Sequence, residues 1–292
     1  MTAPMTPTPP TPRLTGSALL RGRPLGRQID VFGLTDKGRV RASNEDEFLI
    51  ASLHKTMHVH HTSMPDDALP NLTSESNGYL LLVADGVGGS RNGEIASEAA
   101  LSSIAQYATH TMQFCYSNDP ERVGRFLREL QQTVLSVHDI LRNTGPGLAT
   151  TLTMVVVMWP RAYVIHVGDS RCYRLRNGVL ELLTTDQTMA QALVEAGVLS
   201  AADAANSKWK HVLSSALGAN EAMPMATPYD CQWDDRVLVC SDGLTNHVTD
   251  DEIAVALREG ETAEGIVRQL VGLALERGGT DNVTVVVGRL ER

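Results

Sequence analysis

The chain has 292 residues and a mass of 31.6 kDa, and its 25 basic and 34 acidic side chains give a formal charge of −9 at pH 7. This acidity argues against general binding to nucleic acid or to an anionic membrane, because both need a basic face. Apolar residues make up 42% and charged residues 20%, which is typical of a globular protein. No apolar stretch approaches the roughly 18 residues that a membrane span needs. We therefore expect a cytoplasmic protein that binds neither nucleic acid nor membrane.

Cysteine spacing excludes two further classes. Cys115, Cys172, Cys231 and Cys240 are widely separated, and no two of them form a Cys-x-x-Cys pair. The pattern therefore indicates neither a zinc ribbon nor a disulfide framework.

Two polar segments stand apart from the rest of the chain. Residues 1–28 are rich in Pro and Thr and lack a hydrophobic period, so they cannot offset the entropy of ordering and predict a disordered tail. Residues 54–78 interrupt two apolar runs and contain His58, His60 and His61. Alternating histidines can bind metal, but no carboxylate or thiol is close by, so the pattern favours a solvated insert loop.

The remaining chain mixes strands and helices. Taken in order, its patterns predict a strand at 79–84, helices at 94–104 and 123–141, strands at 150–158 and 163–167, a hairpin of 172–176 and 179–183, a strand at 236–240, a helix at 266–275 and a strand at 283–287. Asn177-Gly178 marks the hairpin turn, and Thr249 to Glu252 forms a capping box that opens one more helix. Strands outnumber helices without strict βαβ alternation. This favours an α+β fold of antiparallel sheet covered by helices.

Aspartates fall repeatedly at the ends of the apolar runs. Asp85, Asp169 and Asp242 each follow such a run, and Asp281 stands just before another. A single case is turn chemistry, and four independent turns are the alternative explanation. Converging carboxylates would repel one another and take up protons unless a cation lay among them. Oxygen ligands without His or Cys favour Mg²⁺ or Mn²⁺.

A charged segment at 35–46 places acids beside arginines, just before the run at 48–50. Its acids could extend a metal site through water, and an arginine could bind a phosphate with two parallel hydrogen bonds. A solvated turn is the alternative. The nearby sequence Gly86-Val87-Gly88-Gly89 is not a dinucleotide fingerprint, because Arg91 stands where the third glycine is needed.

The motifs, taken in the order in which they occur along the chain, resemble those of the type 2C, metal-dependent protein serine/threonine phosphatases in their compact bacterial form. The resemblance covers residues 29–292, which we expect to form one phosphatase domain. The matching stretches are 41–46 (RASNED), 83–89 (VADGVGG), 147–151 (GLATT), 167–171 (VGDSR), 183–187 (LTTDQ), 215–218 (SALG), 240–244 (CSDGL) and 279–283 (GTDNV).

The resemblance implies a four-layer αββα fold, an antiparallel β-sandwich flanked by helices, with two Mn²⁺ or Mg²⁺ ions at one end. It implies that Asp85 bridges both ions, that Asp242 and Asp281 hold one of them, and that the Gly86 carbonyl reaches the other. The same resemblance implies that Glu45 acts on a metal through water, with Asp46 and Asn282 behind the ligands. It implies that Asp169 binds a third metal together with Asp242. It also implies that Arg41 binds the phosphate and that 187–214 form a flap.

The implied activity is hydrolysis of phosphoserine and phosphothreonine on proteins by a metal-activated water, with Arg41, Asp85 and Asp242 as the catalytic residues. The implied partners are phosphoproteins and a serine/threonine kinase whose action the enzyme opposes, and we expect a monomer. Many eukaryotic members have a histidine two residues after the bridging aspartate, where this chain has Val87. The group that protonates the leaving alcohol is therefore unassigned, and a metal-bound water is one candidate. A catalytically inactive binding module and a hydrolase of small phosphate esters are the competing interpretations.

Overall fold

The computed structural model describes residues 29–54, 78–88, 91–112 and 119–291. The predicted tail at 1–28 lies outside the described residues, as does the predicted insert apart from its two end residues.

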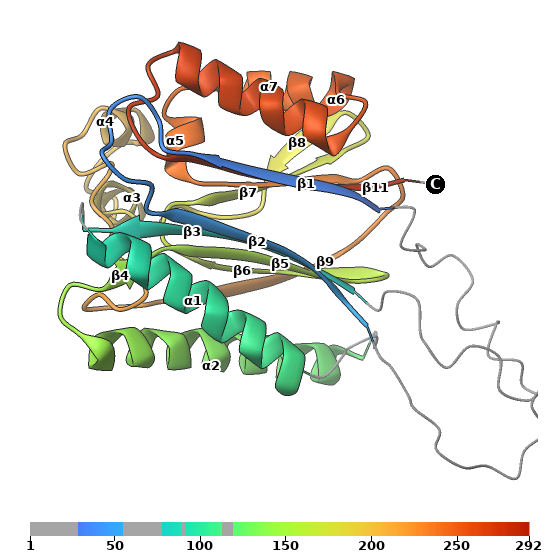
Figure 1. Ribbon diagram of the computed structural model, residues 1–292, viewed down its shortest axis with the longest axis horizontal. Coiled ribbons are helices and arrows are strands. Elements are labelled where there is room, and N and C mark those ends of the chain that lie inside the picture. Colours follow the sequence, from blue (N-terminus) through green and yellow to red (C-terminus); the bar gives the residue numbers. More distant parts are fainter. Residues whose placement is uncertain (1–28, 55–77, 89–90, 113–118, 292) are drawn as a thin grey trace, which may run out of the picture.

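Two antiparallel sheets form the centre of the fold (Figure 1). One contains, in spatial order, β1 (Ile29–Asp36), β11 (Val283–Leu290), β10 (Arg236–Cys240), β7 (Arg171–Arg176) and β8 (Val179–Leu182). The other contains β2 (Asp46–Leu53), β3 (Gly78–Val87), β5 (Leu152–Met158), β6 (Arg161–Val167) and β9 (Met225–Asp230), with the short β4 (Ala149–Thr150) paired to β3.

Helices cover the outer face of each sheet. The long helices α1 (Arg91–His110) and α2 (Pro120–Thr144) lie below the second sheet in Figure 1, and α6 (Asp250–Glu259) and α7 (Ala263–Glu276) lie above the first. The short helices α3 (Met189–Glu195), α4 (Ala201–Ala205) and α5 (Asp242–Thr245) gather at one end of the sandwich. The expected four-layer αββα arrangement is therefore confirmed.

The layering follows from the two-residue period of the strands. In β3, Leu80 and Leu82 join the core that packs against α1 and α2, whereas Leu81 and Val83 join the core between the two sheets. Both faces of the strand are buried, which explains its continuous apolar run.

All the predicted strands and helices are present, including the capping box of Thr249 and Glu252 at the start of α6. The sequence did not predict β1, β2 or β9. Each of them is an edge strand, and most of its residues are only partly buried, so its apolar pattern is weak. None of the helices in the described ranges is long and apolar enough to cross a membrane.

Candidate functional site

One large cavity, of about 1520 Å³, lies at the end of the sandwich where α3 and α5 are found. The residues that line it include six that the sequence singled out, from five separate segments: Arg41 between β1 and β2, Asp85 and Gly86 in β3, Asp169 between β6 and β7, Asp242 at the start of α5, and Asp281 just before β11. The fold thus brings together acids that are up to 196 positions apart in the sequence.

Asp85 is the electrostatic centre of the group. It pairs with Asp46 across the β2–β3 ladder, so two carboxyl groups face each other on adjacent strands. Burial raises the pKa of Asp85 well above its ordinary value, and the negative charges of Asp46, Asp242, Asp169 and Asp281 raise it further. Each of these four acids is therefore close enough to destabilise a charge on Asp85.

Asp46 lies behind the cavity wall and is 2% exposed. Its Oδ2 accepts hydrogen bonds from Ser241 Oγ and Thr284 Oγ1, both at 2.7 Å. Its Oδ1 is buried and has no hydrogen-bond partner. Burial is the main cause that raises the pKa of Asp46, to about 7, against the lowering effect of the two hydroxyls. A buried carboxylate oxygen with nothing to balance it is costly, and a cation in the cavity would relieve that cost.

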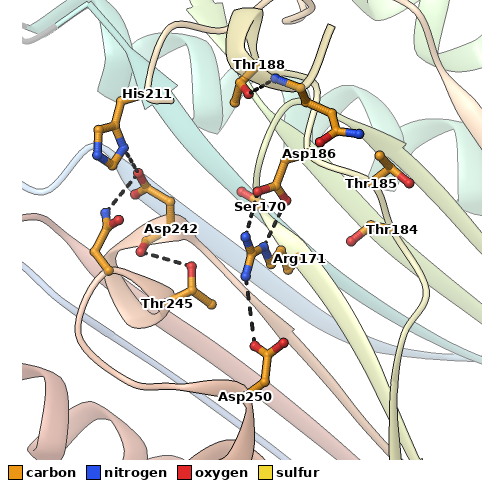
Figure 2. A network of polar contacts seen from close by, with 12 residues as sticks. Ser170, Arg171, Thr184, Thr185, Asp186, Thr188, His211, Asp242, Thr245 and Asp250 are labelled. Carbon is orange, nitrogen blue, oxygen red and sulfur yellow. Dashed lines mark hydrogen bonds and ion pairs between the residues drawn. The ribbon is translucent and has the colours of Figure 1, made fainter. Parts of the chain in front are cut away.

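Asp169 has a similar environment. Burial, followed by the charges of Asp242 and Asp186, raises its pKa to about 8, while Arg171 acts in the opposite direction. The effect of Arg171 is limited because its guanidinium is engaged by Asp186 through two hydrogen bonds, of 2.9 Å and 2.7 Å (Figure 2). Among the residues that the structure describes, Asp169 therefore lacks a full cationic partner.

The carboxylates nearest the opening take their hydrogen bonds from neighbouring side chains. Asp281 Oδ2 accepts from Arg41 at 2.7 Å, and this bond is the main cause that raises the pKa of the arginine. Asp242 Oδ2 accepts from Asn246 at 3.1 Å. The same oxygen lies 3.8 Å from His211 Nδ1, and Figure 2 shows the His211 ring beside the Asp242 carboxylate.

Within the described ranges, no three His, Cys, Asp or Glu side chains are gathered as closely as ligands of one ion would be. Acids that line the cavity instead accept hydrogen bonds from neighbouring donors. Their chemistry nevertheless fits Mg²⁺ or Mn²⁺: several hard oxygen donors, raised pKa values at Asp85, Asp46 and Asp169, and an unbalanced buried oxygen on Asp46.

Glu45 and Asn282 support the cavity from behind. The Glu45 backbone N–H donates to Asn282 Oδ1 at 2.8 Å, and the Asn282 amide donates to the carbonyls of Lys37 and Ser43. This ties the segment that carries Arg41 to the start of β11. Gly93 packs against this carboxylate: a Cβ at that position would lie 2.2 Å from Glu45 Oε2, so the Glu45 side chain would have to move.

The resemblance implies a flap at 187–214, but the sequence did not reveal the contacts that this segment makes with the site. His211 is a single histidine in a polar stretch, and nothing in its spacing points to Asp242. Gln187 accepts from the Gly168 N–H at 3.0 Å and donates to the Met223 carbonyl at 2.9 Å, so it connects the Asp169 turn to the opposite wall. Val87 lines the cavity, so an aliphatic side chain stands where the resemblance would place a histidine.

The fold is a sandwich of two antiparallel sheets between helical layers, and carboxylates and an arginine line a cavity at one end. The sequence profile described as Protein phosphatase 2C matches residues 55–269, and the chain belongs to this family.

Two curated relatives extend the comparison. Serine/threonine protein phosphatase PstP of Mycobacterium tuberculosis is 34% identical over 242 residues, which are 80% of this chain and 45% of that protein. The chain thus spans about half the length of this relative. Serine/threonine phosphatase stp of Listeria monocytogenes is 29% identical over 257 residues, which are 87% of this chain and 92% of that protein.

Among solved structures, the catalytic domain of PstP in complex with two manganese ions is 30% identical, with a TM-score of 0.68. The likeness covers 90% of this chain and 99% of the PstP domain. The two manganese ions belong to the PstP structure.

Proposed function

We propose that this chain is a metal-dependent protein serine/threonine phosphatase that hydrolyses phosphoserine and phosphothreonine on proteins. One observation carries the proposal: Asp85, Asp242 and Asp281 line the same cavity as Arg41, in a chain of the Protein phosphatase 2C family. The cavity pairs anionic groups, which suit divalent cations, with a cationic group that suits a phosphate.

In this proposal Asp85, the Gly86 carbonyl, Asp242 and Asp281 hold two Mn²⁺ or Mg²⁺ ions, and Glu45 contributes through water. Asp169 contributes with Asp242 to a third ion, and Asp46 and Asn282 stand behind the ligands. When bound, such ions lower the pKa of a water molecule and neutralise charge on the phosphoryl group.

The protein's own groups then bind and orient the ester. Arg41 presents a planar, permanently charged fork that can donate two hydrogen bonds to phosphoryl oxygens. It is 46% exposed and its segment is held by Asn282, so the guanidinium is both fixed and accessible. Holding the phosphoryl group in one orientation lowers the entropic cost of an in-line attack.

Such an activity presupposes a kinase that phosphorylates serine or threonine on the same proteins. We therefore propose a serine/threonine kinase as the opposing partner, acting with this chain in the cytoplasm.

The test compares a phosphothreonine peptide, a nucleotide and p-nitrophenyl phosphate as substrates, with Mn²⁺ and with EDTA. We expect the phosphopeptide to be hydrolysed with the highest kcat/KM, EDTA to stop the reaction, and added Mn²⁺ to restore it. Hydrolysis of the nucleotide alone would favour a small-ester hydrolase, turnover of none of the three would favour a binding module, and activity that survives chelation would contradict the metal dependence.

A further inference from the structure

One wall of the cavity is apolar and open to solvent. The apolar wall consists of Met189, Val212, Met223 and Met225, whose side chains are 39%, 41%, 49% and 47% exposed. They line the same cavity as Asp85 and Asp242, so the wall and the place where the phosphoryl group would bind belong to one cavity. Exposed apolar side chains gathered in a cavity beside polar groups mark a binding surface.

The backbone of the apolar wall is held by hydrogen bonds. The Met189 N–H donates to the Val212 carbonyl at 2.7 Å, and the Met223 N–H donates to Ser215 Oγ at 2.9 Å. Met225 lies in β9, paired with His166 of β6. The exposure of these side chains is therefore a property of the folded segment, and three flexible thioether side chains can adapt to apolar groups of different shape.

A direct connection joins this wall to the acids. Gln187 accepts from the Gly168 N–H, next to Asp169, and donates to the Met223 carbonyl. The buried Gln187 side chain therefore connects the Met223 backbone to the turn that carries Asp169.

The charges beside the wall select against acidic groups. Glu195 and Glu221 are exposed and line the cavity, as do Lys210 and His211. A substrate with Asp or Glu next to its phosphorylated residue would bring further negative charge to this place. A large apolar residue would instead pack against the methionines, and both would be removed from water.

We propose that the apolar wall binds a large apolar side chain, such as leucine, beside the phosphorylated residue of the substrate protein. This inference rests on the proposed phosphatase activity and specifies its substrate class: phosphothreonine or phosphoserine segments with an apolar neighbour and without adjacent acids. Partial burial of one leucine side chain predicts an advantage of about tenfold in kcat/KM over serine.

The test uses phosphothreonine peptides that carry Leu, Ser or Glu in turn at each of the two positions on either side of the phosphothreonine. For the full chain with Mn²⁺ we expect, at one or more of these positions, Leu to exceed Ser by about tenfold and Glu to be the poorest. We expect Met223→Gln and Met225→Gln to reduce the preference for Leu over Ser to about twofold or less, with melting temperatures close to that of the parent chain.

Val198→Gln is the matched control, because Val198 is 66% exposed on the same segment but is not among the residues that line the cavity. We expect this variant to keep the full preference. Equal hydrolysis of Leu and Ser peptides by the parent chain, or an undiminished preference in both methionine variants, would overturn the inference while leaving the phosphatase activity intact. Failure of every phosphopeptide while p-nitrophenyl phosphate is hydrolysed would instead overturn the proposed function, and this inference with it.

Discussion

Asp242 illustrates how individual residues combine structural and chemical roles. It begins α5, directly after the buried strand β10, and its backbone carbonyl accepts from Asn246 N–H at 2.8 Å. The same residue contributes to the raised pKa values of Asp85, Asp46 and Asp169. Its side chain therefore affects every buried acid of the cavity.

We expect Asp242→Asn to lower kcat by about a thousandfold or more, because the variant loses an anionic ligand while keeping the shape of the side chain. The measurement is the initial rate on a phosphothreonine peptide at saturating Mn²⁺. Asp139→Asn, at an exposed position of α2, is the control and is expected to retain the parent rate. A rate for Asp242→Asn near that of the parent would remove Asp242 from the metal site.

Arg41 is bound to Asp281 at 2.7 Å, so it competes with a cation for that carboxylate. We expect Arg41→Lys to weaken inhibition by inorganic phosphate about tenfold, because lysine cannot donate two parallel hydrogen bonds. Calorimetric affinity for Mn²⁺ is expected to stay about the same, since lysine keeps a positive charge beside Asp281. A parallel loss of phosphate and Mn²⁺ binding would show that Arg41 only supports the fold of the site.

Helix α6 shows what local sequence patterns can predict at the scale of an element. The Thr249 hydroxyl accepts from the Glu252 N–H, and the Glu252 carboxylate accepts from the Thr249 N–H at 3.0 Å. We expect Thr249→Ala to lower the free energy of unfolding by about 1 kcal/mol, since one N–H at the helix start loses its partner. Chemical denaturation measures this, and Val255→Ala, an exposed change in the same helix, is expected to cost nothing. Equal losses in the two variants would contradict the capping role.

Other elements could not be predicted, for reasons that lie outside their own residues. β9 contains Pro228 and is partly exposed, so its sequence lacks the alternation of a strand, and it forms because β6 offers a pairing edge.

The positions of Asp85, Asp242 and Asp281 after or before apolar runs did predict that acids would meet at one end. Arg41 and His211 did not follow from spacing as partners of these acids, because tertiary packing brings them there, whereas Asn246 lies one helical turn after Asp242.

At the scale of the whole molecule, His166 makes stability depend on pH. It is 2% exposed, and burial lowers its pKa to about 4, against an opposing effect of Asp186. Its ring nitrogens contact Thr153 Oγ1 at 2.9 Å and the Thr185 carbonyl at 3.1 Å. The unfolded chain takes up a proton on His166 near pH 6.5, whereas the folded chain does so only near pH 4, so this group destabilises the fold as the pH falls between these values.

We expect the parent chain to lose about 3 kcal/mol relative to His166→Gln between pH 7 and pH 4. Urea denaturation of both chains at several pH values measures the difference, and the comparison removes the contributions of the cavity acids, which both chains share. Parallel stability curves for the two chains would show that His166 titrates normally in the fold.

The central claim is that the acids of the cavity bind divalent cations, and calorimetric titration of the purified chain with Mn²⁺ tests it most directly. The account predicts saturable binding of about two ions per chain, strongly weakened by Asp85→Asn and unaffected by Asp139→Asn. The absence of saturable binding to the parent chain, or equal binding by the parent and Asp85→Asn, would contradict it.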